Sequence, residues 1–221
     1  MPEIIRVETS RRSADTNSAM RTCLLTLLLL LAFQGCVRAA DPGAHSPLIL
    51  PDLHGGEKRP LAVKGHGTVL FFITHDCPIS NTYSPEIRRL QAEFESQGFS
   101  FSIVYVDPDA KTATLRKHQQ EFGLESLTAF HDRHHRLVTT TGAKVTPEAV
   151  VIDKQGVIAY RGRINNLYAD FGKRRRRATV TELRDALQAM LKGTPIKTPR
   201  SDAIGCYIPK VRNLKADEKQ P

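Results

Sequence analysis

The sequence predicts an α/β protein with a mixed central sheet and helices on both faces. Apolar runs typical of buried strands alternate with amphipathic helical patterns through the middle of the chain. A turn signal then separates two β-rich runs, which indicates an antiparallel hairpin. Alternation first and a hairpin last predict a sheet with parallel and antiparallel neighbours. The 221 residues, 40% of them hydrophobic, suffice for one domain with a sizeable core.

The first expected strand and helix are the most sharply marked. Thr68–Thr74 (TVLFFIT) shows no polar alternation, as in a central strand buried on both faces. Residues 78 to 97 follow as a helix, opened by Pro78, whose missing N–H costs nothing at a first helical position. Three apolar residues of this segment share one helical face: Ile87, Leu90 and Phe94.

The remaining elements follow in alternation. Periodicity and turn residues predict, in order, a strand at Phe99–Val106, a helix at Thr112–Phe122, a short strand at Leu127–Phe130, a short helix at His134–Thr141, a hairpin of Ala149–Ile152 with Val157–Arg161, and a helix at Ala178–Leu191 that stops at Gly193.

The chain divides into four segments. Residues 1–39 are expected to be a signal peptide, because a ten-residue apolar stretch, Leu24–Phe33, follows Arg21. The segment Val37-Arg38-Ala39 then provides the small residues at −3 and −1 that are typical of a cleavage site. Translation from Met20 instead of Met1 would give a more usual leader. Residues 40–67 are an irregular entry segment with a small edge hairpin, 68–193 the main domain, and 194–221 a polar tail. The mature protein is then exported, periplasmic or otherwise extracytoplasmic, without a membrane span; lipid attachment at Cys36 is the weaker alternative.

Removing the leader changes the cysteine count more than the charge. Cys23 and Cys36 leave with it, so that only Cys77 and Cys206 remain of four cysteines. The leader holds five arginines and three acids, which leaves a net charge of +7 out of +9. Two cysteines in an exported chain suggest a pair, because that compartment permits disulfides.

A run of five basic residues, Lys173–Arg177 (KRRRR), carries much of the remaining charge. It is consistent with an acidic partner, nucleic acid or an anionic membrane. A solvated loop is the simpler interpretation, because no aromatic or groove-reading motif accompanies the run. We therefore expect no specific nucleic-acid partner.

Cys77 is the first candidate for chemistry. It lies after a buried strand and before a helix, where the free N–H groups of the first turn stabilise a thiolate, the reactive form of cysteine. Asp76 acts in the opposite direction, because a nearby carboxylate raises a thiol pKa. A buried, inert cysteine is the structural alternative.

Two stretches, VLFFITHDCPISNTYSPEI and VTPEAVVIDKQGVIAYRGRI, resemble the thioredoxin-fold redoxins, which include peroxiredoxin-like (AhpC/TSA-like) proteins and exported thiol–disulfide oxidoreductases. The resemblance covers about residues 48 to 193. Cys77 stands at the place of the nucleophilic thiol, and Pro85 at that of a mid-helix proline. Thr146-Pro147 matches the family's cis-proline loop, which faces the thiol. The resemblance therefore implies a thioredoxin-like three-layer α/β/α fold, in which a cis Pro147 turns the Thr146 backbone toward the sulfur.

The sequence departs from both standard redoxin sites. Ser80 replaces the second cysteine of a CxxC pair. In the peroxiredoxin pattern Thr74 fits the hydroxyl position, but Leu70 occupies the proline position. The match is closest to single-CP-motif members. Arg163 is a further candidate: it would either stabilise a thiolate at Cys77 or bind peroxide there, or it would lie exposed at a strand end.

The predicted function is a thiol oxidoreductase or peroxidase-like enzyme that acts on a disulfide or peroxide, is reset by an external thiol reductant, and needs no cofactor or metal. Cys206 is the expected resolving thiol: it lies in an apolar island of the tail, and the twelve residues after Gly193 can cross the domain at roughly 3.3 Å each. It could instead pair between chains. The alternatives are a redox-dead interaction domain, or a thioredoxin-fold copper-binding module using Cys77, Cys206 and a histidine from a set comprising His66, His75, His131, His134 and His135.

Overall fold

The computed structural model describes residues 48–211. The predicted leader and the last ten residues lie outside this range, so the expectations of a signal peptide, of Met20 as a start and of lipid at Cys36 remain expectations. Within the described residues no helix is long and apolar enough to cross a membrane.

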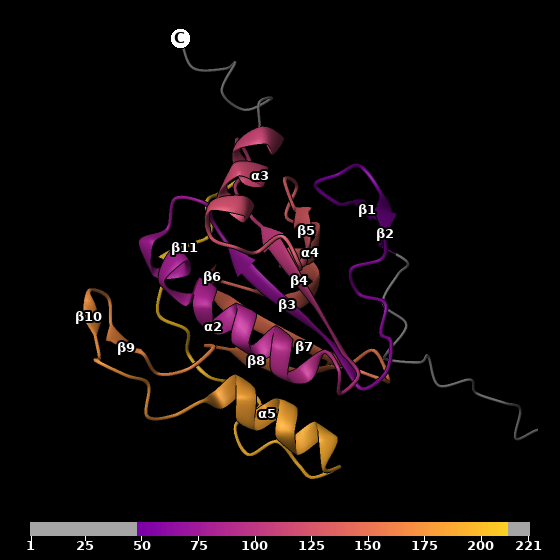
Figure 1. Cartoon of the computed structure of the whole chain (residues 1–221), viewed down its shortest axis with the longest axis vertical. Coiled ribbons are helices and arrows are strands. Elements are labelled where there is room, and N and C mark those ends of the chain that lie inside the picture. Colours follow the sequence, from indigo (N-terminus) through magenta and orange to yellow (C-terminus); the bar gives the residue numbers. More distant parts are fainter. Residues whose placement is uncertain (1–47, 212–221) are drawn as a thin grey trace, which may run out of the picture. The chain divides into compact units, whose positions relative to one another are not determined.

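A five-stranded mixed sheet forms the centre of the fold, with strand order β5-β4-β3-β7-β8 (Figure 1). The central strand β3 pairs in parallel with β4 and antiparallel with β7. The bounds are β3 Gly67–Ile73, β4 Phe99–Tyr105, β5 Thr128–His131, β7 Glu148–Asp153 and β8 Ile158–Gly162. The predicted mixed sheet and its closing hairpin are confirmed.

Helices cover both faces of the sheet, as predicted. They are α2 Pro78–Phe94, α3 Thr112–Glu121, α4 Arg136–Thr141 and α5 Glu182–Leu191. Alternate residues of β3 point into two separate apolar clusters. Phe71 packs in the cluster formed with α2, α3 and α5, whereas Phe72 packs in the cluster that includes Leu137 of α4. All seven residues of β3 are buried, which explains the absence of alternation in its sequence.

Short strand pairs complete the structure. In the entry segment β1 Leu50–Pro51 pairs with β2 Glu57–Lys58, which confirms the expected edge hairpin. Buried leucines of this segment, Leu48, Leu50 and Leu61, belong to the second apolar cluster. The sequence did not predict the hairpin of β9 Tyr168–Asp170 with β10 Lys173–Arg174, or the pair of β6 Val145–Thr146 with β11 Cys206–Tyr207.

The last helix begins four residues later than predicted. Residues 178 to 181 lie before α5, and Val180 is 44% exposed. The C-terminal end was predicted correctly, since Gly193 adopts a positive φ of 63° just beyond the helix, where glycine has no Cβ penalty. Helix α2 continues through Pro85.

Candidate active site

Cys77 occupies the junction of β3 and α2 and serves as the N-cap of the helix. Its Sγ accepts a hydrogen bond from the backbone N–H of Ser80 at 3.5 Å, so a free donor of the first helical turn is directed at the sulfur. Ser80, at the position of the absent second cysteine, is buried. Cys77 itself is only 2% exposed. The sequence order of strand, cysteine, proline and helix predicted the position of Cys77 at the helix N-terminus.

The loop between β6 and β7 faces the same sulfur. The Thr146–Pro147 peptide bond is cis, as the resemblance implied. The Cys77 Sγ lies 3.4 Å from the carbonyl oxygen of Thr146. The Thr74 hydroxyl lies 3.4 Å from the Thr146 hydroxyl. Four of the residues singled out in the sequence, Cys77, Thr74, Thr146 and Pro147, are therefore brought together.

Cys206 completes this group from the far end of the chain. Strand β11 runs antiparallel to β6, with Cys206 opposite Thr146. The Sγ atoms of Cys77 and Cys206 are 2.6 Å apart, although 129 positions separate the two residues in sequence. Both cysteines are free thiols in this structure. The apolar island of the tail thus docks on the cis-proline loop.

Two close backbone contacts hold the tail in this position. At the edge of β8, the N–H of Arg161 donates to Pro199 O and the N–H of Ser201 donates to Arg161 O. The Ser201 hydroxyl lies 2.8 Å from the hydroxyl of the buried Tyr160. A Cβ at Gly162 would lie only 2.8 Å from the Ser201 nitrogen, so this approach requires glycine.

A second approach occurs next to Cys206. A Cβ at Gly205 would overlap the Thr146 carbonyl oxygen and would lie 2.6 Å from its carbonyl carbon. Glycine at position 205 therefore allows β11 to lie against β6. The sequence predicted an apolar island around Cys206 but gave no indication that Gly205 was needed for this close contact.

The pKa values of the two thiols are shifted in opposite directions. Burial acts to raise the pKa of Cys77, but the hydrogen bonds from the Cys206 side chain and the Ser80 N–H outweigh it, so that the pKa is lowered from 9.0. Burial, the hydrogen bond to Cys77 and the charges of Cys77 and Asp76 raise the pKa of Cys206 to about 12. Near neutral pH, Cys77 is the better thiolate and Cys206 is the proton donor of the pair.

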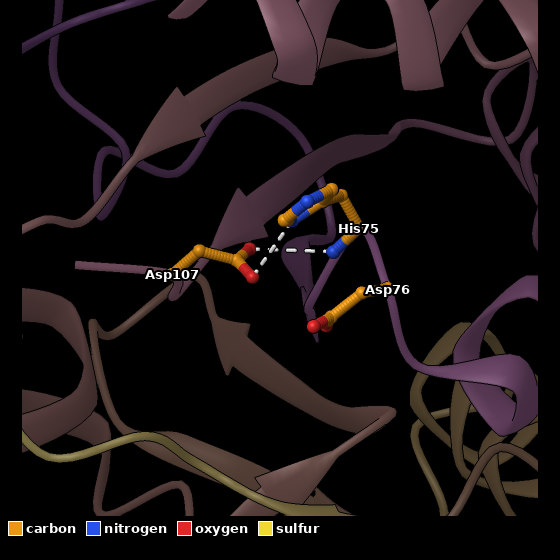
Figure 2. A group of neighbouring side chains, drawn as sticks. All are labelled: His75, Asp76 and Asp107. Carbon is orange, nitrogen blue, oxygen red and sulfur yellow. Dashed lines mark hydrogen bonds and ion pairs between the residues drawn. The ribbon is translucent and has the colours of Figure 1, made fainter. Parts of the chain in front are cut away.

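The charge of Asp76 contributes to the raised pKa of Cys206. His75 turns toward Asp107 (Figure 2): its Nδ1 lies 2.9 Å from Asp107 Oδ1, and its backbone N–H donates to Asp107 Oδ2 at 3.3 Å. Burial raises the pKa of Asp107. The sequence did not single out Asp107, because nothing in the local pattern indicates a partner 32 residues away.

The histidines do not complete a copper site with the two cysteines. His131 and His135 bond backbone oxygens of Asp107 and Val106 at 2.7 and 3.0 Å, and His75 faces Asp107. Among residues 48–211 the only set of three potential metal-binding side chains in mutual reach is His75, Asp76 and Asp107, within 4.8 Å of one another. Neither cysteine belongs to it, and the copper alternative therefore lacks its histidine.

Arg163 is the predicted site residue that the structure places elsewhere. Its guanidinium forms an ion pair with the buried Glu182, and its Nε donates to Glu182 Oε1 at 2.6 Å. In the described part of the chain it makes no hydrogen bond or ion pair with either cysteine. A buried carboxylate at the start of α5 requires a cationic partner, which explains this pairing.

The family model described as the AhpC/TSA family matches residues 44–161. The chain belongs to the AhpC/TSA family. The matched region contains Cys77 and the cis-proline loop but ends before the tail that carries Cys206. No curated protein matches the sequence.

Two solved structures with TM-scores above 0.5 show the same fold, and a third similar structure falls below that value. An uncharacterized conserved protein from Geobacillus kaustophilus matches with a TM-score of 0.64 and 25% identity, over 74% of this chain and 88% of that one. A hypothetical protein from Sinorhizobium meliloti 1021 matches with a TM-score of 0.62 and 21% identity, over 73% and 89%. A secreted disulfide oxidoreductase from Mycobacterium tuberculosis has a TM-score of 0.48 and 16% identity, over 66% and 96%.

Proposed function

We propose that this AhpC/TSA-family protein is a thiol–disulfide oxidoreductase in which Cys77 is the nucleophile and Cys206 the resolving thiol. The observation that carries the proposal is the 2.6 Å separation of the two sulfurs beside the cis-proline loop. The lowered pKa of Cys77 and the raised pKa of Cys206 support this division of roles. Thr74, Thr146 and Pro147 position the sulfurs.

The reaction consists of two exchanges. The Cys77 thiolate attacks one sulfur of a substrate disulfide, a mixed disulfide forms, and the second substrate sulfur leaves as a thiolate that takes up a proton. Cys206 then loses its proton and attacks the Cys77 sulfur, which releases the first substrate thiol and leaves a Cys77–Cys206 disulfide. An external dithiol reduces this bond and is itself oxidised.

Disulfides fit the site better than peroxides. Thr74, the residue at the peroxiredoxin hydroxyl position, is directed at Thr146, and Arg163 is held by Glu182. Leu70, at the position of the peroxiredoxin proline, is buried in the core. The edge of β6 is a backbone surface that pairs with an extended segment, as β11 demonstrates.

The tail must move during each cycle. With 2% of its surface exposed, Cys77 cannot be approached by a substrate while β11 occupies the β6 edge. The pairing of two residues on each side is small enough to open transiently. Cys206 therefore has the two positions that a resolving thiol needs, away during attack and adjacent afterwards.

We further propose that the enzyme works outside the cytoplasm after removal of residues 1–39. The apolar stretch Leu24–Phe33 and the exit at Val37–Ala39 support export. N-terminal sequencing of the mature protein should begin near Ala40. A mature chain that retains the apolar stretch would contradict the signal peptide.

The roles of the thiols can be tested by trapping. Reduced Cys206→Ser protein, mixed with a peptide that contains one disulfide, should accumulate a mixed disulfide on Cys77, detectable as the added peptide mass. Wild type should release the reduced peptide, and Cys77→Ser should not react. The proposal would be wrong if Cys206→Ser formed no adduct while hydrogen peroxide rapidly produced the internal disulfide in wild type. Those two results together would indicate a peroxidase instead of a thiol–disulfide oxidoreductase.

A further inference from the structure

The hairpin of β9 and β10, with the residues that follow it, forms a basic projection, which we call the basic hairpin (residues 168–177). It contains five basic residues, Lys173–Arg177, and a single acid, Asp170. All five basic side chains are exposed. The sequence alone favoured a solvated loop here, because no aromatic or groove-reading motif accompanies the run. In the structure the run begins within the paired strand β10, and Phe171 in the preceding turn is exposed.

The basic hairpin is anchored beside the thiol site. The Tyr168 hydroxyl donates to the Thr82 hydroxyl at 3.2 Å, and the Tyr168 ring lies 6.0 Å from the ring of Tyr83. Thr82 lies five residues after Cys77 in helix α2, roughly 7.5 Å along the helix axis at about 1.5 Å per residue. Figure 1 shows β9, β10 and β11 on the same side of the sheet. A partner bound to the basic hairpin is therefore held near the sulfurs.

The tip of the basic hairpin combines an exposed aromatic ring with arginine side chains that have no acidic partner among the described residues. Phe171, in the turn, is 68% exposed. Asp170 is paired with Lys173 at 3.1 Å, and Arg175 donates to Asn166 O at 3.3 Å. Within residues 48–211 the other three arginine side chains form no hydrogen bond or ion pair: Arg174, Arg176 and Arg177. These guanidinium groups remain available to an external anion.

We propose that the basic hairpin binds an acidic protein segment that carries or flanks the substrate disulfide. Guanidinium groups bind carboxylates through paired N–H donors, and an exposed aromatic ring adds apolar contact at an interface. The short path from Thr82 to Cys77 favours a partner that reacts at this site over an anionic membrane or a nucleic acid. The inference rests on the proposed function and adds its substrate class.

If the basic hairpin attracts acidic segments, the rate at which the protein reduces a disulfide peptide should depend on the charge of that peptide. Three disulfide peptides of equal length, flanked by glutamate, glutamine or lysine, are each mixed with the reduced protein, and the second-order rate constant of reduction is measured. At low ionic strength the glutamate peptide should react about tenfold faster than the glutamine peptide. The ratio should fall toward one in about 0.5 M salt, because screening weakens exposed charge interactions.

A charge-matched pair of variants locates the effect. Arg174→Gln/Arg176→Gln/Arg177→Gln should reduce the ratio of the glutamate rate to the glutamine rate to about twofold or less. Three exposed lysines at the opposite end of the sheet provide the control: Lys64, Lys154 and Lys192. Residue 154 adjoins Asp153, which pairs with the first residue of β3. The triple lysine-to-glutamine variant should keep the wild-type ratio.

A binding experiment separates this inference from the proposed chemistry. Glutamate-flanked peptide with serines in place of its cysteines should bind wild type in fluorescence anisotropy and lose about tenfold in affinity with the hairpin variant. Binding with no reduction of any disulfide peptide would reject the proposed function and keep an acidic-segment site. Any one of three results would overturn the inference. The first is equal rates for the three peptides with no peptide binding, and the second is an unchanged rate ratio in the hairpin variant. The third is hairpin-dependent binding only to phosphatidylglycerol vesicles or to single-stranded DNA.

Discussion

Gly205→Ala should separate the two thiols without changing either of them. The added Cβ would overlap Thr146 O, and it would lie 2.6 Å from the Thr146 carbonyl carbon and 3.1 Å from Pro147 N. Ordinary van der Waals contact begins at 3.4 Å, so β11 must shift by about 1 Å. The Sγ–Sγ separation of 2.6 Å then grows to roughly 3.5 Å or more, and the hydrogen bond that lowers the pKa of Cys77 weakens.

The expected cost of this overlap is about 1–3 kcal/mol, the usual range for forcing an extra carbon into a packed contact. That corresponds to about a 5- to 150-fold smaller population of the docked tail. The internal disulfide should be disfavoured by the same factor. Equilibration with glutathione buffers of varied ratio, followed by acid quenching and mass spectrometry, would report the fraction of protein carrying the Cys77–Cys206 bond.

Asp202→Ala is the matched control, because it introduces the same residue in the same tail at an exposed position. It should leave the glutathione ratio at half-oxidation unchanged. An unchanged ratio in Gly205→Ala as well would refute the reasoning, because it would show that the close approach of β11 to β6 does not govern the pairing of the thiols.

Three further results are expected. Alkylation of Cys77 should rise with pH about a midpoint below 9.0, whereas Cys206 should titrate far higher; equal midpoints would remove the division of roles. A chain that ends at Ile204 should expose Cys77 and raise its alkylation rate at pH 8 by about tenfold or more, since the tail no longer covers the sulfur; an unchanged rate would show that other residues bury it. Burial lowers the pKa of His118 from 6.5 to about 4, so on acidification the unfolded chain binds this proton before the folded protein does. The free energy of unfolding should therefore decrease as the pH falls from 6.5 to about 4, by at most about 3 kcal/mol. In denaturant titrations His118→Gln should show a correspondingly smaller loss over that range, and an identical pH dependence would contradict the assignment.

Much of the fold was predictable because single strands and helices follow local rules. A run of β-branched and aromatic residues predicted strand β3. The position of Cys77 between a strand and a proline predicted its role at the helix N-terminus. The start of α5 was placed too early because residues 178 to 181 continue an amphipathic pattern, although their backbone is not helical.

The rest of the site depends on contacts that sequence spacing does not encode. Cys206 could be proposed as a partner by elimination, but its pairing with β6 requires Gly205 and the tail's bonds along β8. The pairing of His75 with Asp107 and that of Arg163 with Glu182 arise where separate elements meet. Arg163 does lie near the tail, because its backbone N–H donates to the Ser201 hydroxyl, but its guanidinium forms an ion pair with the buried Glu182.

Peptide mapping after one equivalent of a substrate disulfide tests the pairing of Cys77 with Cys206 most directly. The reduced wild-type protein is quenched in acid at successive times and digested without reductant. The account predicts that a Cys77–Cys206 linked peptide appears as the substrate is reduced, and that Cys206→Ser abolishes it. A substrate adduct that persists on Cys77 while Cys206 stays free in the wild type would contradict it.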